Sequence, residues 1–169
     1  MLANSVREVG EDAFTQVRSL RSVRLSRELE TIGPRAFFQS KAHKVVVPGS
    51  VRHIAERAFA EVSLVSLRFE SENALAGLGE NAFADAFIFH LFFPGSMRKI
   101  PSGILSGARQ IWTVHIGEGT TELEDGCFAG LDVKKVHFPA SLRKIGADAF
   151  SDCPGLWSVH VPSGAMRVS

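Results

Sequence analysis

A dipeptide of alanine and phenylalanine recurs along this chain at nearly constant intervals. The pair ends at Phe14, Phe37, Phe59, Phe83 and Phe150, and the variants Ile104-Leu105 and Cys127-Phe128 fill the remaining gap. The successive steps are 23, 22, 24, 22, 23 and 22 residues. A period in this range is typical of solenoids, in which each turn of chain buries its apolar side against its neighbours. The sequence therefore predicts seven stacked units.

Two further apolar columns keep the same step. An aliphatic side chain stands five residues before each phenylalanine position: Val9, Ile32, Ile54, Leu78, Ile100, Leu123 and Ile145. After each phenylalanine position comes a block of the pattern L-x-x-L-x-L, such as Ile111, Val114 and Ile116, and proline closes four of these blocks. The alternation predicts a short strand with one buried face, which proline ends because it lacks a backbone N–H.

The segment between the first aliphatic residue and the phenylalanine predicts a tight turn into one helical or 3-10 turn. Acidic residues stand near its start in five units, where they would meet the positive ends of the peptide dipoles: Glu11, Glu56, Glu80, Asp125 and Asp148. We interpret these acids as local caps and not as catalytic carboxylates.

The complete motif is clearest in two units. Ile32-Gly33-Pro34-Arg35-Ala36-Phe37 is matched by Ile145-Gly146-Ala147-Asp148-Ala149-Phe150, which continues into Ser151-Asp152-Cys153. Over about residues 6–162 the chain resembles the BspA-like subclass of leucine-rich repeats. Members of this subclass are commonly surface proteins of bacteria and of some protists, so the resemblance implies a surface location and a role in adhesion.

The expected fold is an α/β-type repeat solenoid, a right-handed leucine-rich-repeat coil. A parallel β-sheet would line its concave face, and short helical or 3-10 turns its convex face. We expect a single domain over residues 1–169, with units at about 6–28, 29–50, 51–73, 74–96, 97–120, 121–141 and 142–164. Neither end of the array carries a recognisable polar cap, which leaves end-to-end self-association, or a longer array, as an alternative.

Bulk properties narrow the function classes. Neither a signal peptide nor an apolar stretch of membrane-spanning length is visible, so the sequence predicts a cytoplasmic protein. The alternative is an extracellular or cell-surface location, if the chain is a fragment of a longer protein. Cys127 occupies the alanine position of the repeat, whereas Cys153 lies in a different column, so we expect both thiols to be buried and unpaired. No set of nucleophile, base and orienting group can be assembled, so we expect no enzyme and no cofactor.

Two columns of each strand are expected to face outward, and neither contains aspartate or glutamate. The first is Ser22, Lys44, Ser66, His90, Thr113, Lys135 and Ser158; the second is Arg24, Val46, Arg68, Phe92, His115, His137 and His160. A face with charge of one sign favours an acidic protein partner. The small extent of the patch and the pI of 7.9 argue against nucleic acid.

Aromatic residues gather in the later units. Phe89, Trp112 and Trp157 stand where strands begin, and the sequence leaves open whether they face a partner or pack over the sheet edge. The predicted partner-binding residues of the concave face are Arg24, Lys44, Arg68, His90, Phe92, Trp112, His115, Lys135, His137, Trp157 and His160.

Consecutive histidines in the second column form a ladder of His115, His137 and His160. Such a ladder would support either metal binding, for instance zinc, or a pH-dependent contact with a partner. Since no carboxylate or thiolate completes a ligand set, no metal site is predicted. The favoured function is a non-catalytic protein–protein interaction scaffold, as a subunit of a larger complex. A fragment of a secreted or surface adhesion protein is the alternative, and metal binding through the ladder is the weaker one.

Overall fold

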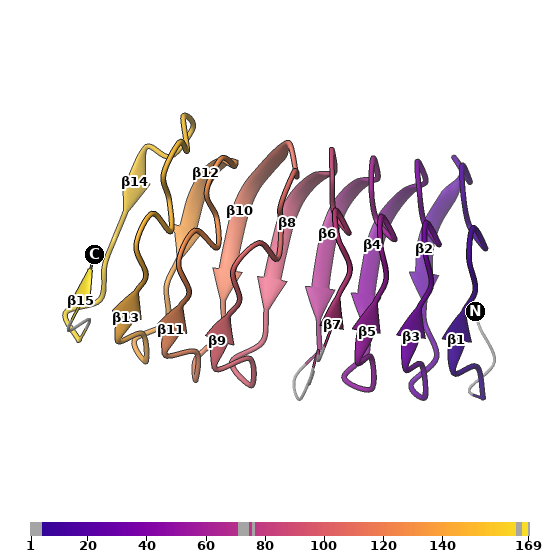
Figure 1. Cartoon of the computed structure of the whole chain (residues 1–169), viewed down its shortest axis with the longest axis horizontal. Coiled ribbons are helices and arrows are strands. Elements are labelled where there is room, and N and C mark those ends of the chain that lie inside the picture. The colour runs from indigo at the N-terminus through magenta and orange to yellow at the C-terminus, as the bar shows by residue number, and fades with distance from the viewer. Residues whose placement is uncertain (1–4, 71–74, 76, 165–166, 169) are drawn as a thin grey trace.

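The computed structural model shows a parallel β-solenoid of about seven turns, stacked in one row (Figure 1). It describes residues 5–70, 75, 77–164 and 167–168. Each turn contributes one strand to a seven-stranded parallel sheet with the order β14-β12-β10-β8-β6-β4-β2. The strands are β2 (Leu20–Arg24), β4 (Lys41–Val47), β6 (Ser63–Phe69), β8 (Phe87–Phe93), β10 (Gln110–Ile116), β12 (Asp132–His137) and β14 (Ser158–Val159).

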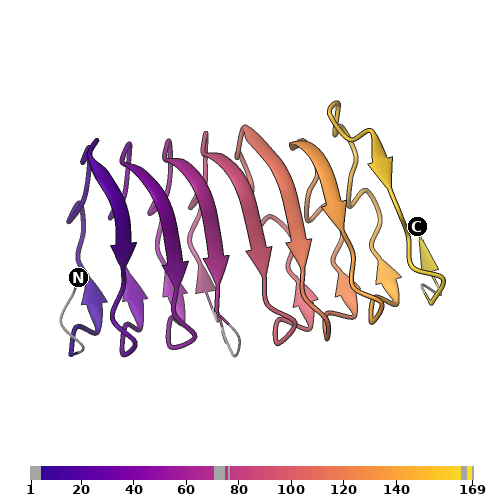
Figure 2. The same ribbon diagram turned by 180° about the vertical axis from the view of Figure 1, so that it is seen from behind.

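A second line of very short strands runs along the other side of the solenoid, as Figure 2 shows from behind. These strands contain the aliphatic column that precedes the phenylalanines. Four form one sheet, β1 (Glu8–Val9), β3 (Thr31–Ile32), β5 (His53–Ile54) and β7 (Gly77–Leu78). Four more form another, β9 (Lys99–Ile100), β11 (Glu122–Leu123), β13 (Lys144–Ile145) and β15 (Arg167–Val168).

Pro101, which follows β9, explains why the short strands form two separate sheets with a break between β7 and β9. The residue after each short strand donates its backbone N–H to the previous turn, as Gly79 donates to the Ile54 carbonyl and Glu124 to the Ile100 carbonyl. Proline has no N–H to donate at this position, so the ladder loses a hydrogen bond there.

The predicted helical or 3-10 turns are wrong, since no helix occurs among the residues that the structure describes. Two positions in each turn, two residues before and two after the phenylalanine position, have positive φ. Examples are Arg35 at 50° and Gln39 at 54°, with Gly103 and Gly107 in the fifth turn. A left-handed residue at every fourth position cannot continue a right-handed helix.

Hydrogen bonds between turns replace the helical ones. Alternate N–H groups donate to the next turn of the solenoid, as Phe37 donates to the Ala58 carbonyl at 2.8 Å. The others close tight turns within the segment, as Phe38 donates to the Arg35 carbonyl at 2.9 Å. The expected helix caps are wrong for the same reason; the Asp125 carboxylate accepts from the Ala147 N–H of the next turn instead.

The core consists of the stacked columns between the sheets. Phe14, Phe37, Phe59 and Phe83 form a continuous stack with centroid separations of 5.0 to 5.3 Å. Leu105 interrupts the column, and Phe128 and Phe150 resume it. Turns that repeat at the spacing of parallel strands place equivalent rings face to face. Within the described residues there is no helix long and apolar enough to cross a membrane.

Candidate functional site

The outward side of the seven-stranded sheet is the surface on which the predicted site residues lie; we call it the open face. The strand register aligns both predicted outward columns across the sheet, with pairs such as Lys44 opposite Ser66 and Arg68 opposite Phe92. Buried side chains alternate with these columns, as Leu91 and Phe93 do on either side of Phe92. The register is therefore confirmed for the strands that pair, and the alternation for β4 to β12. In β14 the alternation is wrong: Val159, expected to face inward, is 40% exposed because β14 is the edge strand of the sheet.

Two consecutive residues face outward near the start of the longer strands. In β8 both Phe89 and His90 are exposed between buried Ile88 and Leu91. The same pattern exposes Trp112 in β10. The aromatic residues at the starts of these two strands therefore face outward and do not cover the core, which decides between the two orientations that the sequence leaves open.

Phe89 and Trp112, together with Phe87 two residues earlier on the same side of β8, form a group that we call the aromatic shelf. Phe87, Phe89 and Trp112 are 45%, 49% and 47% exposed. The rings of Phe89 and Trp112 lie 5.2 Å apart between centroids and are tilted by 46°. Half-exposed rings of this size, grouped on adjacent strands, are unusual for a surface without a partner.

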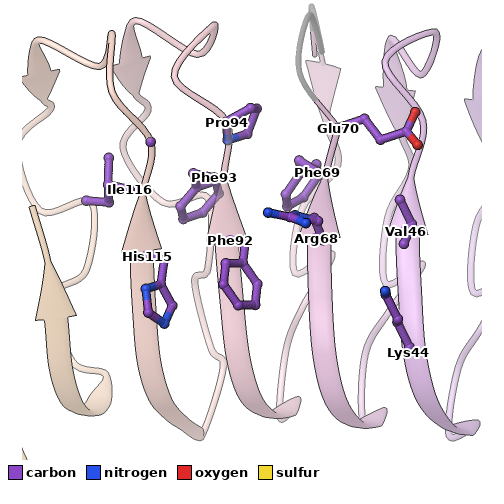
Figure 3. A pocket seen from close by; sticks show the side chains of 11 residues that line it. Lys44, Val46, Arg68, Phe69, Glu70, Phe92, Phe93, Pro94, His115 and Ile116 are labelled. Atoms are coloured by element: carbon purple, nitrogen blue, oxygen red, sulfur yellow. The ribbon is translucent and has the colours of Figure 1, made fainter. Parts of the chain in front are cut away.

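A second group crosses four strands nearer their carboxyl ends, and we call it the cationic stack after its arginine: Arg68, Phe92, His115 and His137. The Arg68 guanidinium lies 5.2 Å from the centre of the Phe92 ring. Phe92 stacks on His115 at 4.6 Å, and His115 stacks on His137 at 4.5 Å. Figure 3 shows Arg68, Phe92 and His115 in a row on successive strands. The separations match the spacing of strands in a sheet, which explains why equivalent side chains stack.

A hollow of about 880 Å³ lies alongside the cationic stack. Its lining on the open face consists of Lys44, Val46, Arg68, Phe92 and His115 (Figure 3). The carboxyl ends of β6, β8 and β10 complete it, with Phe69, Phe93, Pro94, Ile116 and Gly117. One acidic side chain, Glu70, stands at its rim. Glu70 was not among the predicted site residues because it follows the last outward column.

The cations of the two predicted outward columns have no acidic partners within the described part of the chain. Arg24, Lys44, Arg68 and Lys135 form no ion pair with a carboxylate of that part. One ion pair, between Lys134 and Asp132 at 2.6 Å, lies within β12 of this sheet. The others form elsewhere, mainly between successive turns, as Glu122 does with Lys99 and Lys144. Arg24, Lys44, Arg68 and Lys135 therefore carry positive charge that no carboxylate of the described residues pairs with, although the chain as a whole has a formal net charge of only +1.

The histidine ladder is shorter than predicted. His115 and His137 are aligned and stacked, whereas His160 follows β14, beyond the end of the pairing between β12 and β14. Burial, followed by the charges of His137, His90 and Lys135, lowers the pKa of the His115 imidazole.

Face-to-face stacking also bears on the metal-binding alternative. The lone pairs of each imidazole lie in the plane of its ring, so two parallel rings 4.5 Å apart direct them side by side and not at one ion. Among the described residues, no group of three or more histidine, cysteine, aspartate or glutamate side chains is arranged to hold a metal.

The remaining predicted residues lie outside both groups. Arg24 lies at the first strand and Lys135 at the sixth. Trp157, which directly precedes β14, is 82% exposed.

The cysteines are free, as predicted. Cys127 is buried, and burial raises the pKa of its thiol to about 12. Cys153 is half-buried, where the sequence predicted full burial, and its thiol donates to the Phe128 carbonyl at 3.1 Å. Burial raises the pKa of this thiol as well, so neither cysteine has the lowered pKa of a nucleophile.

Comparisons with known proteins agree with the repeat. The family described as the BspA type leucine rich repeat region (6 copies) matches residues 1–107 and 36–157. Among curated proteins none matches the chain. A leucine-rich repeat protein from Bacteroides ovatus ATCC 8483 is similar in structure, with 18% identity and a TM-score of 0.39 over 95% of this chain and 60% of that one.

A second solved structure is similar to the same degree. It is a leucine rich cell surface protein from Faecalibacterium prausnitzii A2-165, with 15% identity and a TM-score of 0.45 over 96% of this chain and 66% of that one. The chain thus spans less than two thirds of the length of either structure.

Proposed function

The chain belongs to the BspA-type leucine-rich-repeat family, and we propose that it is a non-catalytic interaction scaffold that binds an acidic protein partner on its open face. The observation that carries this proposal is the set of cations that have no ion-pair partner among the described residues and lie among exposed aromatic rings on neighbouring strands. Charge of one sign on the binding surface accelerates encounter with a partner of opposite charge, and aromatic and arginine side chains dominate binding energy where they become desolvated.

A site-specific cross-linker tests this function. A photoreactive amino acid at position 113 would replace Thr113, which lies on the open face between His90 and Lys135. The same group at position 129 replaces the exposed Ala129 of a turn segment and serves as the control. We expect a discrete adduct from position 113 alone in extracts or cultures of the source cells.

Charge reversal then separates specific docking from chance capture. Arg68→Glu should abolish the adduct, whereas Arg98→Glu, outside the open face and before β9, should leave it unchanged. Both arginines are exposed, so neither change should unfold the protein. Equal yields from positions 113 and 129, or an adduct indifferent to Arg68→Glu, would contradict binding on this face.

Binding on the open face is compatible with both roles, a subunit of a larger complex and an adhesion module. The cytoplasmic location predicted from the sequence receives no support from the comparisons. Fractionation of source cells with an antibody to this chain, combined with protease treatment of intact cells, separates the two roles: digestion on intact cells assigns the protein to the surface.

A further inference from the structure

Over β8 and β10 the open face divides into an apolar half and a cationic half along the direction of its strands, and the Lys134–Asp132 ion pair of β12 flanks the apolar half. The aromatic shelf occupies the starts of β8 and β10, with Phe87, Phe89 and Trp112 each about half exposed. The cationic stack and its hollow lie toward the carboxyl ends of the strands. A ligand that covers both halves must therefore present an apolar group and an anionic group together.

The separation of the halves follows from the strand itself. Phe89 of the shelf and Phe92 of the stack are three residues apart on β8, which corresponds to about 10 Å at the rise of a β-strand. In a polyproline-type extended peptide, residues three apart share one face and lie about 9 Å from each other. An extended segment of this kind, aligned with β8, spans the two halves without bending.

The cationic half is suited to a carboxylate. The Arg68 guanidinium rests on the Phe92 ring, which orients it, and no carboxylate among the described residues pairs with it. Lys44 lies at the same hollow. A guanidinium held in place loses less freedom when it binds a carboxylate, and it can donate two parallel hydrogen bonds.

We propose that the open face recognises an extended segment of a partner protein in which a large apolar side chain lies three residues from an aspartate or glutamate. The apolar side chain packs on Phe89 and Trp112, and the carboxylate binds Arg68 beside Lys44. This recognition rests on the proposed scaffold function and specifies the chemistry of the partner. Glu70 at the rim of the hollow and the near-neutral net charge favour a short acidic peptide over a polyanion such as nucleic acid.

Synthetic peptides test the motif with the full chain. Fluorescently labelled peptides on a Gly-Ser background would carry one tryptophan and one glutamate at spacings from one to six residues, in both orders, and binding is followed by anisotropy. We expect the spacing of three to bind most tightly in one of the two orders. Replacing the glutamate by glutamine or the tryptophan by alanine should each weaken binding by about tenfold.

Variants of the protein assign the two contacts. Arg68→Gln should remove the preference for glutamate over glutamine but retain the preference for tryptophan, and Trp112→Ala should do the reverse. Arg98→Gln is the matched control for Arg68→Gln, since Arg98 is exposed and lies outside the open face, before β9; it should bind like the unaltered chain. Equal affinity for glutamate and glutamine peptides, or indifference to spacing, would overturn the motif.

A single-stranded oligonucleotide of thymidines supplies the competing ligand class. Tighter binding of this oligonucleotide than of any peptide, with steep loss in salt, would assign the face to nucleic acid and overturn the proposal. If the motif fails while a partner still cross-links at position 113, the motif is wrong and the scaffold function stands. If no partner cross-links there, the scaffold function fails independently of the peptides.

Discussion

Phe59 provides the sharpest test of what holds the solenoid together. Its ring is fully buried and stacks on Phe37 at 5.0 Å and on Phe83 at 5.3 Å, with planes inclined by 4° in both pairs. Phe14, at the end of the same column, is half-buried and, among the described residues, stacks on Phe37 alone. Leucine occupies an equivalent place at Leu105, so the backbone of the repeat accepts a leucine there.

The magnitude follows from the number of ring pairs lost. An aromatic pair contributes about 0.5–1.5 kcal/mol beyond its buried area. Phe59→Leu removes two pairs and should lower the free energy of unfolding by about 1–3 kcal/mol, whereas Phe14→Leu removes one pair and should cost about half as much. Phe59→Ala also opens a cavity and should cost about 3–5 kcal/mol.

Equilibrium urea unfolding, followed by circular dichroism, measures these differences through the transition midpoint and slope. Both variants lose the same atoms, but Phe14 is half-buried and has one ring partner, so equal costs of the two substitutions are the critical outcome. If Phe14→Leu destabilises the protein as much as Phe59→Leu, stacking along the column is not the source of the stabilisation.

Three further changes probe the turns and the pH response. Gly33→Ala would place a Cβ 2.7 Å from the Val9 carbonyl oxygen and should lower the free energy of unfolding by about 1–3 kcal/mol in urea titrations, whereas Gly10→Ala, with nothing within 4 Å, should not. Two lysines hold the pKa of the Glu122 carboxyl at about 2, so the stabilisation from this carboxylate is present above the ordinary pKa of 4.5 and is lost as pH falls toward 2. Glu122→Gln should therefore reduce the fall in the free energy of unfolding over this acidic range, as measured by urea titrations. The lowered pKa of His115 means that the unfolded chain binds its proton first, so stability should fall as pH drops below about 6.5, and His115→Gln should reduce that slope. An unchanged slope would show that His115 does not couple to folding.

The register of the open face could be predicted from the sequence because it depends on two short periods. A repeat of about 22 residues places equivalent side chains on adjacent strands, and alternation along each strand separates inward from outward positions. These two periods alone place the stacking partners Phe92, His115 and His137 in one column.

The turn segments could not be predicted in the same way. Their local pattern is compatible with a helical turn, but each alternate N–H finds an acceptor on the next turn of the solenoid, about 22 residues away in sequence. The positive φ values at positions such as Arg35 and Asp148 are a consequence of that pairing. Glycines at the equivalent positions Gly103 and Gly126 were the local signal for left-handed backbone there.

The repeat of alanine and phenylalanine therefore determined the stacked architecture, the buried columns and which side chains share the open face. Only the tertiary structure decided that two consecutive residues at the strand starts face outward, which exposes Phe89 and Trp112. It also decided that Arg68 rests on Phe92 beside a hollow. The physical reason is that a period specifies which residues become neighbours, whereas exposure and contact depend on how far each strand extends and where its neighbours end.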